Sequence, residues 1–392
     1  MTWGSRVLRK LRDLVPVSGF IFKQPIVLFQ SDDWGRVGVR DREGFELLRA
    51  AGLALGERPY DLYTLETADD VSALREVLKK HRDSAGRHPC FEMNFLLGNL
   101  DFERMHADGW QSIHVMPLAS GLPSGWSRRG LHEAYRAGMA DGVFHPALHG
   151  ITHFCRSEVE RVILAGGERA ALLRTIWQAG TPYIHWRMPW IGYEYWAPER
   201  PPDERFLAEE AQEQLIGETV GAFAKMFASL PGSACAPGYR ANGDTVRAWA
   251  QHGVKVAQNG PGTFSPPYLD GNEVLQLFRT TEFEPAVQKD FSLEACLKAA
   301  ETCFSAGIPA VVSVHSINFH SSIRDFRTHA LQQLDAFLNA MEAKYSDLLY
   351  VHDTELYELA LTGRCTSRDE TIQAEVHTKR FLKGKFAGEK VV

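Results

Sequence analysis

The stretch IVLFQSDDWG, residues 26–35, runs from apolar residues directly into two adjacent carboxylates, an aromatic residue and a glycine. The apolar start predicts a buried β-strand, and Asp32 and Asp33 follow at its carboxyl end. Neighbouring carboxylates repel each other and lose water as they approach a core, so hydrogen bonds, solvent or a cation must stabilise them. On this stretch alone, an aspartate pair that caps the next segment is the more ordinary explanation.

Further strand-like runs recur along the chain, and helical patterns lie between them. Strands are predicted at 26–31, 90–95, 142–148, 183–188, 254–258, 274–278, 309–316 and 348–352. Helices are predicted at 68–82, 129–140, 156–178, 204–230, 243–252, 291–306, 322–344 and 353–362. Several strands are apolar on both faces, which predicts the α/β class, with a parallel sheet that is covered by helices and is either open or closed into a barrel. Functional groups of such folds gather at the carboxyl ends of strands, where Asp32, Asp33 and His315 are expected.

The composition is that of an ordinary globular protein. With 392 residues, 44% of them hydrophobic, the chain can bury a large core as one elaborated domain or two smaller ones. A formal charge of -6 gives no basic surface for nucleic acid or an anionic membrane. The six cysteines are scattered and include no C-x-x-C pair, which favours reduced thiols and a cytoplasmic location.

The first 24 residues form a basic segment whose charges interrupt every apolar run. We therefore expect neither a signal peptide nor a membrane span. Leu8, Leu11 and Leu14 favour a helix packed on the main domain, with peripheral contact to a membrane surface as the alternative. The predicted division is a basic segment at 1–24, the α/β domain at 25–362 and a basic tail at 363–392.

A second unusual stretch is FHPALHGITHF, residues 144–154. His149 and His153 stand four residues apart, which places both imidazoles on one face of a helical turn, within reach of one metal ion. With 15 histidines in the chain the spacing alone is a weak signal, and a structural pair is the alternative. His145 lies beyond Pro146, which disfavours a continuous helix, so it is expected to support the site at most. Two imidazoles and one carboxylate would leave a second carboxylate free to take a proton from water.

In their order, SDDWG, HGITH and the late SVH resemble the motifs of the polysaccharide deacetylase family, carbohydrate esterase family four. The resemblance implies a distorted (β/α) barrel of about seven strands with long insertions, here at 34–145 and 154–235. It also implies that Asp32 is the general base and His315 the general acid. Asp33, His149 and His153 would bind a divalent metal ion, with zinc as the first choice.

A further family motif has its nearest counterpart in CAPGYR, residues 235–240. The resemblance implies that Tyr239 walls the groove and that its backbone N–H stabilises the oxyanion. Cys235 stands where the family usually has the arginine that orients the base. Arg240 is expected to reach back into the site in its place.

The aromatic stretch YIHWRMPWIGYEYW, residues 183–196, is either a platform for sugar rings or a hydrophobic cover on the domain. Asp353 is expected to cap the last helix. The predicted substrate-binding residues are Trp34, Trp186, Trp190, Tyr239 and Arg240.

These observations predict a metal-dependent hydrolase that removes acetyl groups from N-acetylated or O-acetylated sugars. Residue chemistry alone indicates hydrolysis, and the sugar comes from the resemblance. The alternatives are a metal-dependent hydrolase of another amide, or a non-catalytic carbohydrate-binding protein on the same barrel. No nucleic-acid partner is expected.

Overall fold

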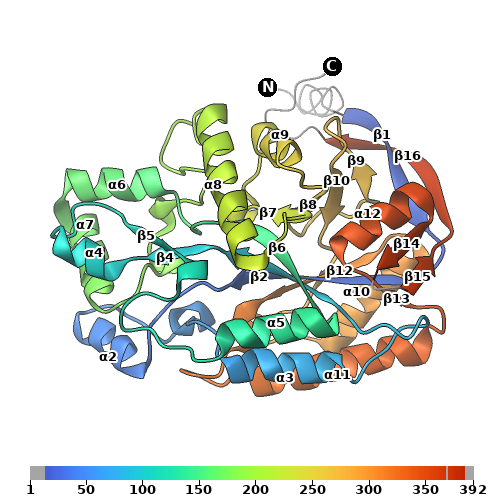
Figure 1. Ribbon diagram of the computed structural model, residues 1–392, viewed down its shortest axis with the longest axis horizontal. Helices are drawn as coiled ribbons and strands as arrows, with labels where there is room; N and C mark the ends of the chain where they lie inside the picture. Colours follow the sequence, from blue (N-terminus) through green and yellow to red (C-terminus); the bar gives the residue numbers. More distant parts are fainter. Residues whose placement is uncertain (1–13, 368–369, 385–392) are drawn as a thin grey trace, which may run out of the picture.

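The strand predicted from IVLFQS, β2 (Ile26–Trp34), lies within a curled, mainly parallel sheet, and all nine of its residues are buried (Figure 1). The computed structural model describes residues 14–367 and 370–384. The parallel strands follow the order β11 (Thr281–Glu282), β12 (Ala310–His315), β2, β3 (Phe91–Leu96), β6 (Phe144–Gly150), β7 (Ser233–Cys235), β8 (Val256–Asn259) and β10 (Leu275–Phe278). A short strand, β13 (Leu349–Tyr350), pairs with the start of β2. The expected α/β class and distorted barrel are confirmed.

One continuous segment bridges the two edges of the curled sheet. Strand β10 pairs with β8, and β11, which begins three residues after β10 ends, pairs with β12 on the opposite edge. The backbone hydrogen bonds switch from one edge to the other between two successive residues. The N–H of Arg279 donates to the carbonyl of Asn259 on β8, and the N–H of Thr280 donates to the carbonyl of Val311 on β12. Arg279 therefore lies where the sheet curls back on itself.

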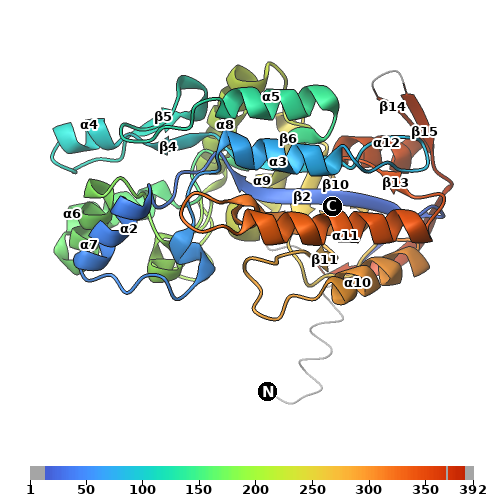
Figure 2. The same ribbon diagram turned by 90° about the horizontal axis from the view of Figure 1, so that it is seen from below.

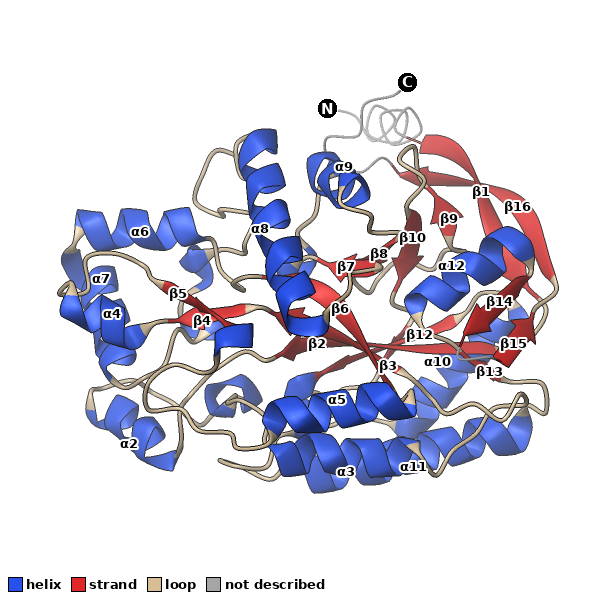
Figure 3. Ribbon diagram, viewed as in Figure 1, coloured by secondary structure: helices blue, strands red, loops and turns tan. Residues whose placement is uncertain are grey.

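Helices cover the outside of the sheet (Figure 3). They are α3 (Ala68–Leu78), α5 (Leu131–Asp141), α8 (Glu209–Phe227), α9 (Gly243–Gln251), α10 (Leu293–Ser305), α11 (Arg327–Lys344) and α12 (Asp353–Thr362). The apolar faces of all of these helices except α12 join the strands in one large buried core, and α12 packs in a second cluster with residues of β2, β10 and β12. None of the described helices is both long and apolar enough to cross a bilayer.

The connections after β2, β3 and β6 are long and gather beyond the carboxyl ends of these strands, on the left in Figures 1 and 2. They contain α2 (Arg42–Ala50), η1 (Pro59–Leu62), β4 (Gly98–Leu100), α4 (Phe102–Ala107), β5 (Val115–Pro117), η2 (Leu118–Ser120), α6 (Arg156–Ala165), α7 (Gly167–Gln178), η3 (His185–Arg187) and η4 (Pro189–Ile191). The expected insertion at 34–145 thus includes a central strand, β3, as well as peripheral elements. This lobe surrounds the end of the sheet where the aspartates lie.

The two ends of the described chain lie side by side (Figure 1). Strand β1 (Leu14–Phe22) pairs antiparallel with β16 (Val376–Gly384) and joins the sheet through β9 (Tyr268–Leu269). A separate hairpin is formed by β14 (Arg364–Ser367) and β15 (Glu370–Gln373). The helix expected around Leu8 and Leu11 lies outside the described residues, and Leu14 begins a strand. The division at residues 24 and 363 stays a prediction.

Most predicted elements are present within a few residues of their expected bounds, and two differ. The helix predicted at 156–178 is two helices, α6 and α7, that meet at Gly166 and Gly167, both with positive φ. The strand predicted at 183–188 is instead irregular chain with the short 3₁₀ turns η3 and η4. Pro182 and Pro189 flank that segment, and proline removes a donor that a sheet would need.

Every second residue of a strand points into the barrel. Several of these inward-pointing residues are polar. Gln30 and Asp32 on β2, Glu92 and Asn94 on β3, and Gln258 on β8 are almost fully buried. They bond across the barrel: Asn94 donates to Asp32 at 2.6 Å and to Gln258 at 2.7 Å. This network extends from one end of the parallel strands to the other.

Candidate active site and metal centre

A bulge at the end of β2 brings both aspartates to one pocket. In a regular strand Asp32 and Asp33 would face opposite sides of the sheet. The register with β3 shifts between Ser31 and Trp34, and Asp33 adopts φ 74°, a left-handed conformation that aspartate tolerates better than most residues. The hydroxyl of Tyr63 fixes the bulge by donating to the Asp33 carbonyl at 2.7 Å. Both carboxylates therefore line the same cavity.

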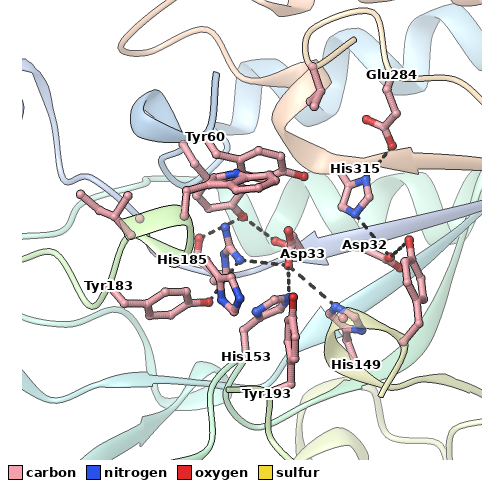
Figure 4. A pocket seen from close by; sticks show the side chains of 18 of the residues that line it. Asp32, Asp33, Tyr60, His149, His153, Tyr183, His185, Tyr193, Glu284 and His315 are labelled. Carbon is pink, nitrogen blue, oxygen red and sulfur yellow. Dashed lines mark hydrogen bonds and ion pairs between the residues drawn. The ribbon is translucent and has the colours of Figure 1, made fainter. Parts of the chain in front are cut away.

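Asp33, His149 and His153, the three residues proposed as metal ligands, bring donor atoms within 4.8 Å of one another (Figure 4). The Asp33 Oδ1 atom lies 3.8 Å from His149 Nε2 and 3.5 Å from His153 Nε2. Ligand atoms of a tetrahedral zinc site lie about 3.3 to 3.5 Å apart at ordinary bond lengths. The histidines are not on a helical turn, however: His149 is the next-to-last residue of β6, and His153 lies in the following loop. Two histidines four residues apart can therefore also meet at one site when a strand end and a loop carry them.

The hydrogen bonds of the histidines suit metal ligation. His149 Nδ1 lies 2.9 Å from the Cys235 carbonyl, which requires Nδ1 to be the donor and leaves the Nε2 lone pair facing Asp33. Burial lowers the pKa of His149 despite the nearby aspartates. Burial, Arg36 and His149 together hold the pKa of His153 well below its usual range. Both shifts favour the neutral imidazole, which is the form that binds a metal ion.

Asp32, His149 and Cys235 form a second set of close donor atoms, but this set does not suit a metal ion. Asp32 is already paired with Arg279, and His149 turns its proton-bearing nitrogen toward Cys235. Burial raises the pKa of the Cys235 thiol well above its usual range, which disfavours the thiolate that a metal would need. The set that contains Asp33 is the better candidate.

Arg279 holds Asp32 in a two-pronged ion pair. Its Nη2 lies 2.5 Å from Asp32 Oδ1 and its Nη1 lies 2.7 Å from Oδ2, and both side chains are buried. Burial alone would raise the pKa of Asp32, but Arg279, His149 and His315 outweigh it and hold this pKa well below its usual range. Asp32 is therefore ionised and rigidly oriented.

His315, at the end of β12, faces Asp32 from the opposite side to the histidine pair (Figure 4). Its Nε2 lies 3.7 Å from Asp32 Oδ2, and its Nδ1 bonds to Glu284 at 2.6 Å. Burial disfavours the imidazolium, but Glu284 and Asp32 outweigh burial and raise the pKa of His315 to about 9. Asn318 donates to the other Glu284 oxygen at 2.6 Å, which fixes the pair.

These residues line a cavity of about 440 Å³ with aromatic walls. Tyr60, Tyr63, Tyr183, His185, Trp186 and Tyr193 contribute to them. Arg36 lies over the Tyr63 ring at 3.8 Å and donates to both Asp33 and Tyr183. The aromatic stretch 183–196 is thus in part a pocket wall and in part a cover.

Two of the predicted substrate-binding residues, Trp34 and Trp190, lie away from the cavity. Trp34 is fully buried, bonds to Ser31 and stacks on Phe319. Trp190 is 8% exposed and lies outside the cavity lining. Their apolar rings pack in the core, as the burial of large aromatic side chains favours.

Arg240 does not reach the base, so that prediction was wrong. It is exposed and lies over the Trp196 ring, 4.6 Å from its centroid. The arginine at Asp32 is Arg279. Its signal in the sequence was its position, directly after the predicted strand 274–278.

Tyr239 is at the site but with a different contact from the expected one. Its backbone N–H donates to the Ala236 carbonyl at 2.8 Å and is not directed at a substrate. Its hydroxyl donates to Asp32 Oδ2 at 3.2 Å and accepts from Arg279 at 2.8 Å. The turn η5 (Pro237–Tyr239) that presents it has positive φ at Gly238 and Tyr239.

Glu194, which sequence reasoning missed, fixes the loop between the two histidines. Its Oε1 accepts the N–H groups of Ile151 and Thr152 at 2.9 and 3.0 Å. At Gly150, φ is 124° and an added Cβ would lie 2.1 Å from Glu194 Oε2, so only glycine fits. Nothing local marks Glu194, because it lies 41 residues beyond His153.

Comparisons with known proteins agree with this architecture. No protein-family model matches the chain, and no curated protein matches it. A solved structure from Parabacteroides distasonis, a candidate glycoside hydrolase/deacetylase, has a TM-score of 0.50 at 11% identity and covers 88% of this chain and 72% of its own. A candidate polysaccharide deacetylase from Mycobacterium smegmatis has a TM-score of 0.44 at 14% sequence identity, and the match covers 89% of this chain and 95% of that protein. A candidate polysaccharide deacetylase from Pseudomonas aeruginosa PAO1 has a TM-score of 0.44 at 11% sequence identity, and the match covers 85% of this chain and 89% of that protein. The first likeness shows a shared fold.

Proposed function

We propose that this protein is a metal-dependent hydrolase that removes acetyl groups from acetylated sugars. The observation that carries the proposal is the convergence of Asp33, His149 and His153 beside Asp32, which is paired with Arg279, and His315, which is paired with Glu284. A carboxylate base, an imidazolium acid and a three-donor metal set in one pocket suit amide or ester hydrolysis.

Asp33, His149 and His153 would hold a divalent ion, with zinc as the first choice. When bound, such an ion polarises a carbonyl and makes bound water more acidic. Asp33 is also held by Arg36, whose Nη1 lies 3.2 Å from its Oδ1. This contact keeps the carboxylate in place beside the two imidazoles.

Asp32 and His315 would move the protons. Arg279, His149 and His315 hold the pKa of Asp32 below its usual range, which favours the free carboxylate, the form that can accept a proton from the attacking water. His315 is protonated at neutral pH, and its bond to Glu284 leaves Nε2 facing the pocket. It can therefore donate a proton to the departing amine.

The sugar is supported by the shape and lining of the pocket. Tyr183 and Trp186 present aromatic surface, on which the apolar C–H faces of sugars stack. The site suits both N-acetyl and O-acetyl groups, because the same two proton transfers serve an amide and an ester. Cytoplasmic location stays a prediction that rests on the reduced cysteines; none of the six, all in the described part of the chain, forms a disulfide.

The test compares Asp32→Asn with Asp33→Asn. The first should keep the metal and lose activity by about a hundredfold or more, since the base is lost. The second should lose metal and activity together. Metal content is measured by elemental analysis and activity by acetate release from a panel of acetylated sugars and simple amides.

The panel also separates the alternatives. Acetate release from simple amides alone would favour a non-sugar hydrolase. Sugar binding without acetate release, in metal-loaded protein, would favour a carbohydrate-binding protein. Parallel loss of metal in both variants would mean that the two aspartates have the opposite roles.

A further inference from the structure

The mouth of the candidate active site is surrounded by a ring of loops. The residues that line the cavity lie at the ends of strands and on the segments that follow β2, β6, β7, β8 and β11. Figure 4 shows Tyr60, Tyr193 and His315 on different sides of the two aspartates. A polymer that reacts at internal residues needs a groove that is open at both ends. Contacts between neighbouring loops therefore decide what kind of substrate can enter.

Arg187 joins the segment after β2 to the segment after β6. Its guanidinium donates to the Asp61 carboxylate at 3.2 Å and also to the Ala54 carbonyl. Asp61 is fully buried and accepts the backbone N–H of Arg58 at 3.2 Å, so it is a fixed partner. The Arg58 guanidinium in turn lies over the Trp186 ring, 5.0 Å from its centroid. These contacts close one side of the ring of loops.

Close packing joins the segments after β6, β7 and β8. The Tyr193 ring lies against Gly238, where an added Cβ would be 2.2 Å from the ring. The Tyr239 ring lies against Gly260 in the same way, and an added Cβ there would be 2.7 Å from it. Neither contact leaves room for a methyl group. A sugar chain therefore cannot pass between these loops.

The segments after β11, β12 and β2 are joined as well. The backbone N–H of Ala286 donates to the Asn318 side chain at 2.8 Å, which links the segment after β11 to the one after β12. The Tyr60 ring, on the segment after β2, packs edge-on against the His315 ring at the end of β12, with centroids 6.2 Å apart. A further side of the ring of loops is thus closed.

Buried polar side chains close the floor of the cavity. Asn94 donates to Asp32 at 2.6 Å, and Asn94 and Gln258 bond to each other in both directions, at 2.7 and 2.9 Å. All three side chains are almost fully buried. A substrate therefore cannot continue from the cavity into the barrel.

The opposite end of the barrel is filled by a separate polar cluster. His145, which was expected to support the metal centre, bonds to Glu92 at 3.1 Å instead. Asp353, the expected cap of the last helix, is fully buried and accepts from Gln30 at 2.9 Å. His352 caps α12 in its place. The polar interior thus extends through the barrel and gives the substrate no second exit.

One side of the ring of loops differs from the others. Pro261 after β8 and Val287 and Gln288 after β11 all line the cavity. Within the described chain, no hydrogen bond or ion pair joins residues 260–264 to residues 283–289. Pro261 is exposed, and so is Phe264. The cavity is therefore a cup whose wall is open on this side.

We propose that the substrate enters this cup as a chain end, so that the protein acts on a terminal or free acetylated sugar and not on internal residues of a polymer. The inference rests on the proposed function and adds which part of a glycan it takes. An internal residue has a neighbour on each side, whereas the cup is open on one. Its volume of about 440 Å³ is in the range of sites that enclose a small molecule.

The test locates the first acetyl group that is lost. Zinc-loaded wild-type protein is incubated with N-acetylglucosamine or with its linear, fully acetylated pentamer, at equal concentrations of acetyl groups. The reducing end of the pentamer carries ¹⁸O, so tandem mass spectrometry at low conversion distinguishes its five residues. We expect one terminal residue to react at least about tenfold faster than any internal residue, or the free sugar alone to react.

Two other results have separate meanings. Internal residues that react as fast as the terminal ones would overturn this inference and leave the proposed function intact. Acetate release from neither probe, and from no sugar of the wider panel, would contradict the proposed function, and the inference would fall with it.

A variant tests whether the ring of loops causes the preference. Arg187→Ala removes the bonds to Asp61 and Ala54, so internal residues should gain access and the ratio of terminal to internal rates should fall by about threefold or more. Arg169→Ala is the control, since it removes a surface ion pair with Glu199 in the same insertion and should keep the wild-type ratio. An unchanged ratio in folded Arg187→Ala would overturn the inference. Should this variant not fold, the wild-type measurement still tests the proposal.

Discussion

Arg279 occupies the place at Asp32 that an arginine near residue 235 or 240 was expected to fill. It donates to both oxygens of Asp32 from a segment 247 residues away. A guanidinium can make these two parallel bonds and still remain charged when buried. The chemistry of the site could be predicted from the sequence, but the origin of its arginine could not, because the contact depends on how the sheet curls.

Arg279→Lys should therefore reduce activity while leaving the metal in place. Lysine keeps the charge but not the two-pronged geometry, so Asp32 is no longer oriented as a base. We expect kcat/KM to fall roughly tenfold or more, with unchanged metal content. Arg240→Lys is the matched control and should be neutral, because Arg240 is exposed. Similar losses in both variants would contradict the assignment.

The Glu284–His315 pair predicts how activity depends on pH. His315 must be protonated to act as an acid, and its pKa is about 9, so the rate should fall as the pH rises above that value. In Glu284→Gln the carboxylate that favours the imidazolium is gone. The alkaline limb of kcat/KM for an amide substrate should then move to lower pH by about one unit or more.

Glu282→Gln is the control for this shift. Glu282 lines the same cavity, but its carboxylate accepts from Gln288 and forms no hydrogen bond or ion pair with His315 in the described structure. Its profile should match the wild type. An alkaline limb that stays in place in Glu284→Gln would mean that another group titrates there.

At the level of elements, Glu194 joins the aromatic insertion to the loop that carries the histidines. Glu194→Ala leaves two buried N–H groups without an acceptor and frees the loop between His149 and His153. We expect metal affinity to fall by about 10- to 100-fold, measured by competition with a chromophoric chelator.

Glu194→Gln distinguishes positioning from charge. An amide oxygen can still accept from Ile151 and Thr152, so most of the affinity should return. Glu199→Ala, in the same insertion but paired with Arg161 and Arg169 at the surface, should bind metal as the wild type does. Equal affinity in Glu194→Ala and the wild type would show that other contacts hold the loop.

Elements with a strong apolar period could be predicted from the sequence, and those defined by turns could not. Helices such as α3 and α9 begin at capping residues, Thr67 and Asn242, that a sequence shows directly. In contrast, the positive φ of Asp33 depends on a tertiary bond from Tyr63. The three residues of the candidate metal centre could therefore be singled out from the sequence, but the bulge and loop that bring them together could not.

For the whole molecule, the pairing of β1 with β16 should contribute to stability but not to metal binding. A chain that lacks residues 376–392 loses the partner of all nine residues of β1. We expect a lower midpoint of thermal unfolding with unchanged metal content, because the ribbon and the site lie at different ends of the molecule (Figure 1). A chain that lacks residues 1–22 should show a similar loss, since it breaks the same pairing. An unchanged midpoint would contradict this role.

The same ribbon constrains the order in which the chain can assemble during synthesis. Leu14 pairs with Gly384, so β1 emerges from the ribosome long before its partner exists. Until residues 376–384 have been made, the short β9 is the only other described strand that pairs with β1, which therefore presents an open strand edge. The ribbon must therefore close late, and the nascent chain has an interval in which β1 can pair with another chain.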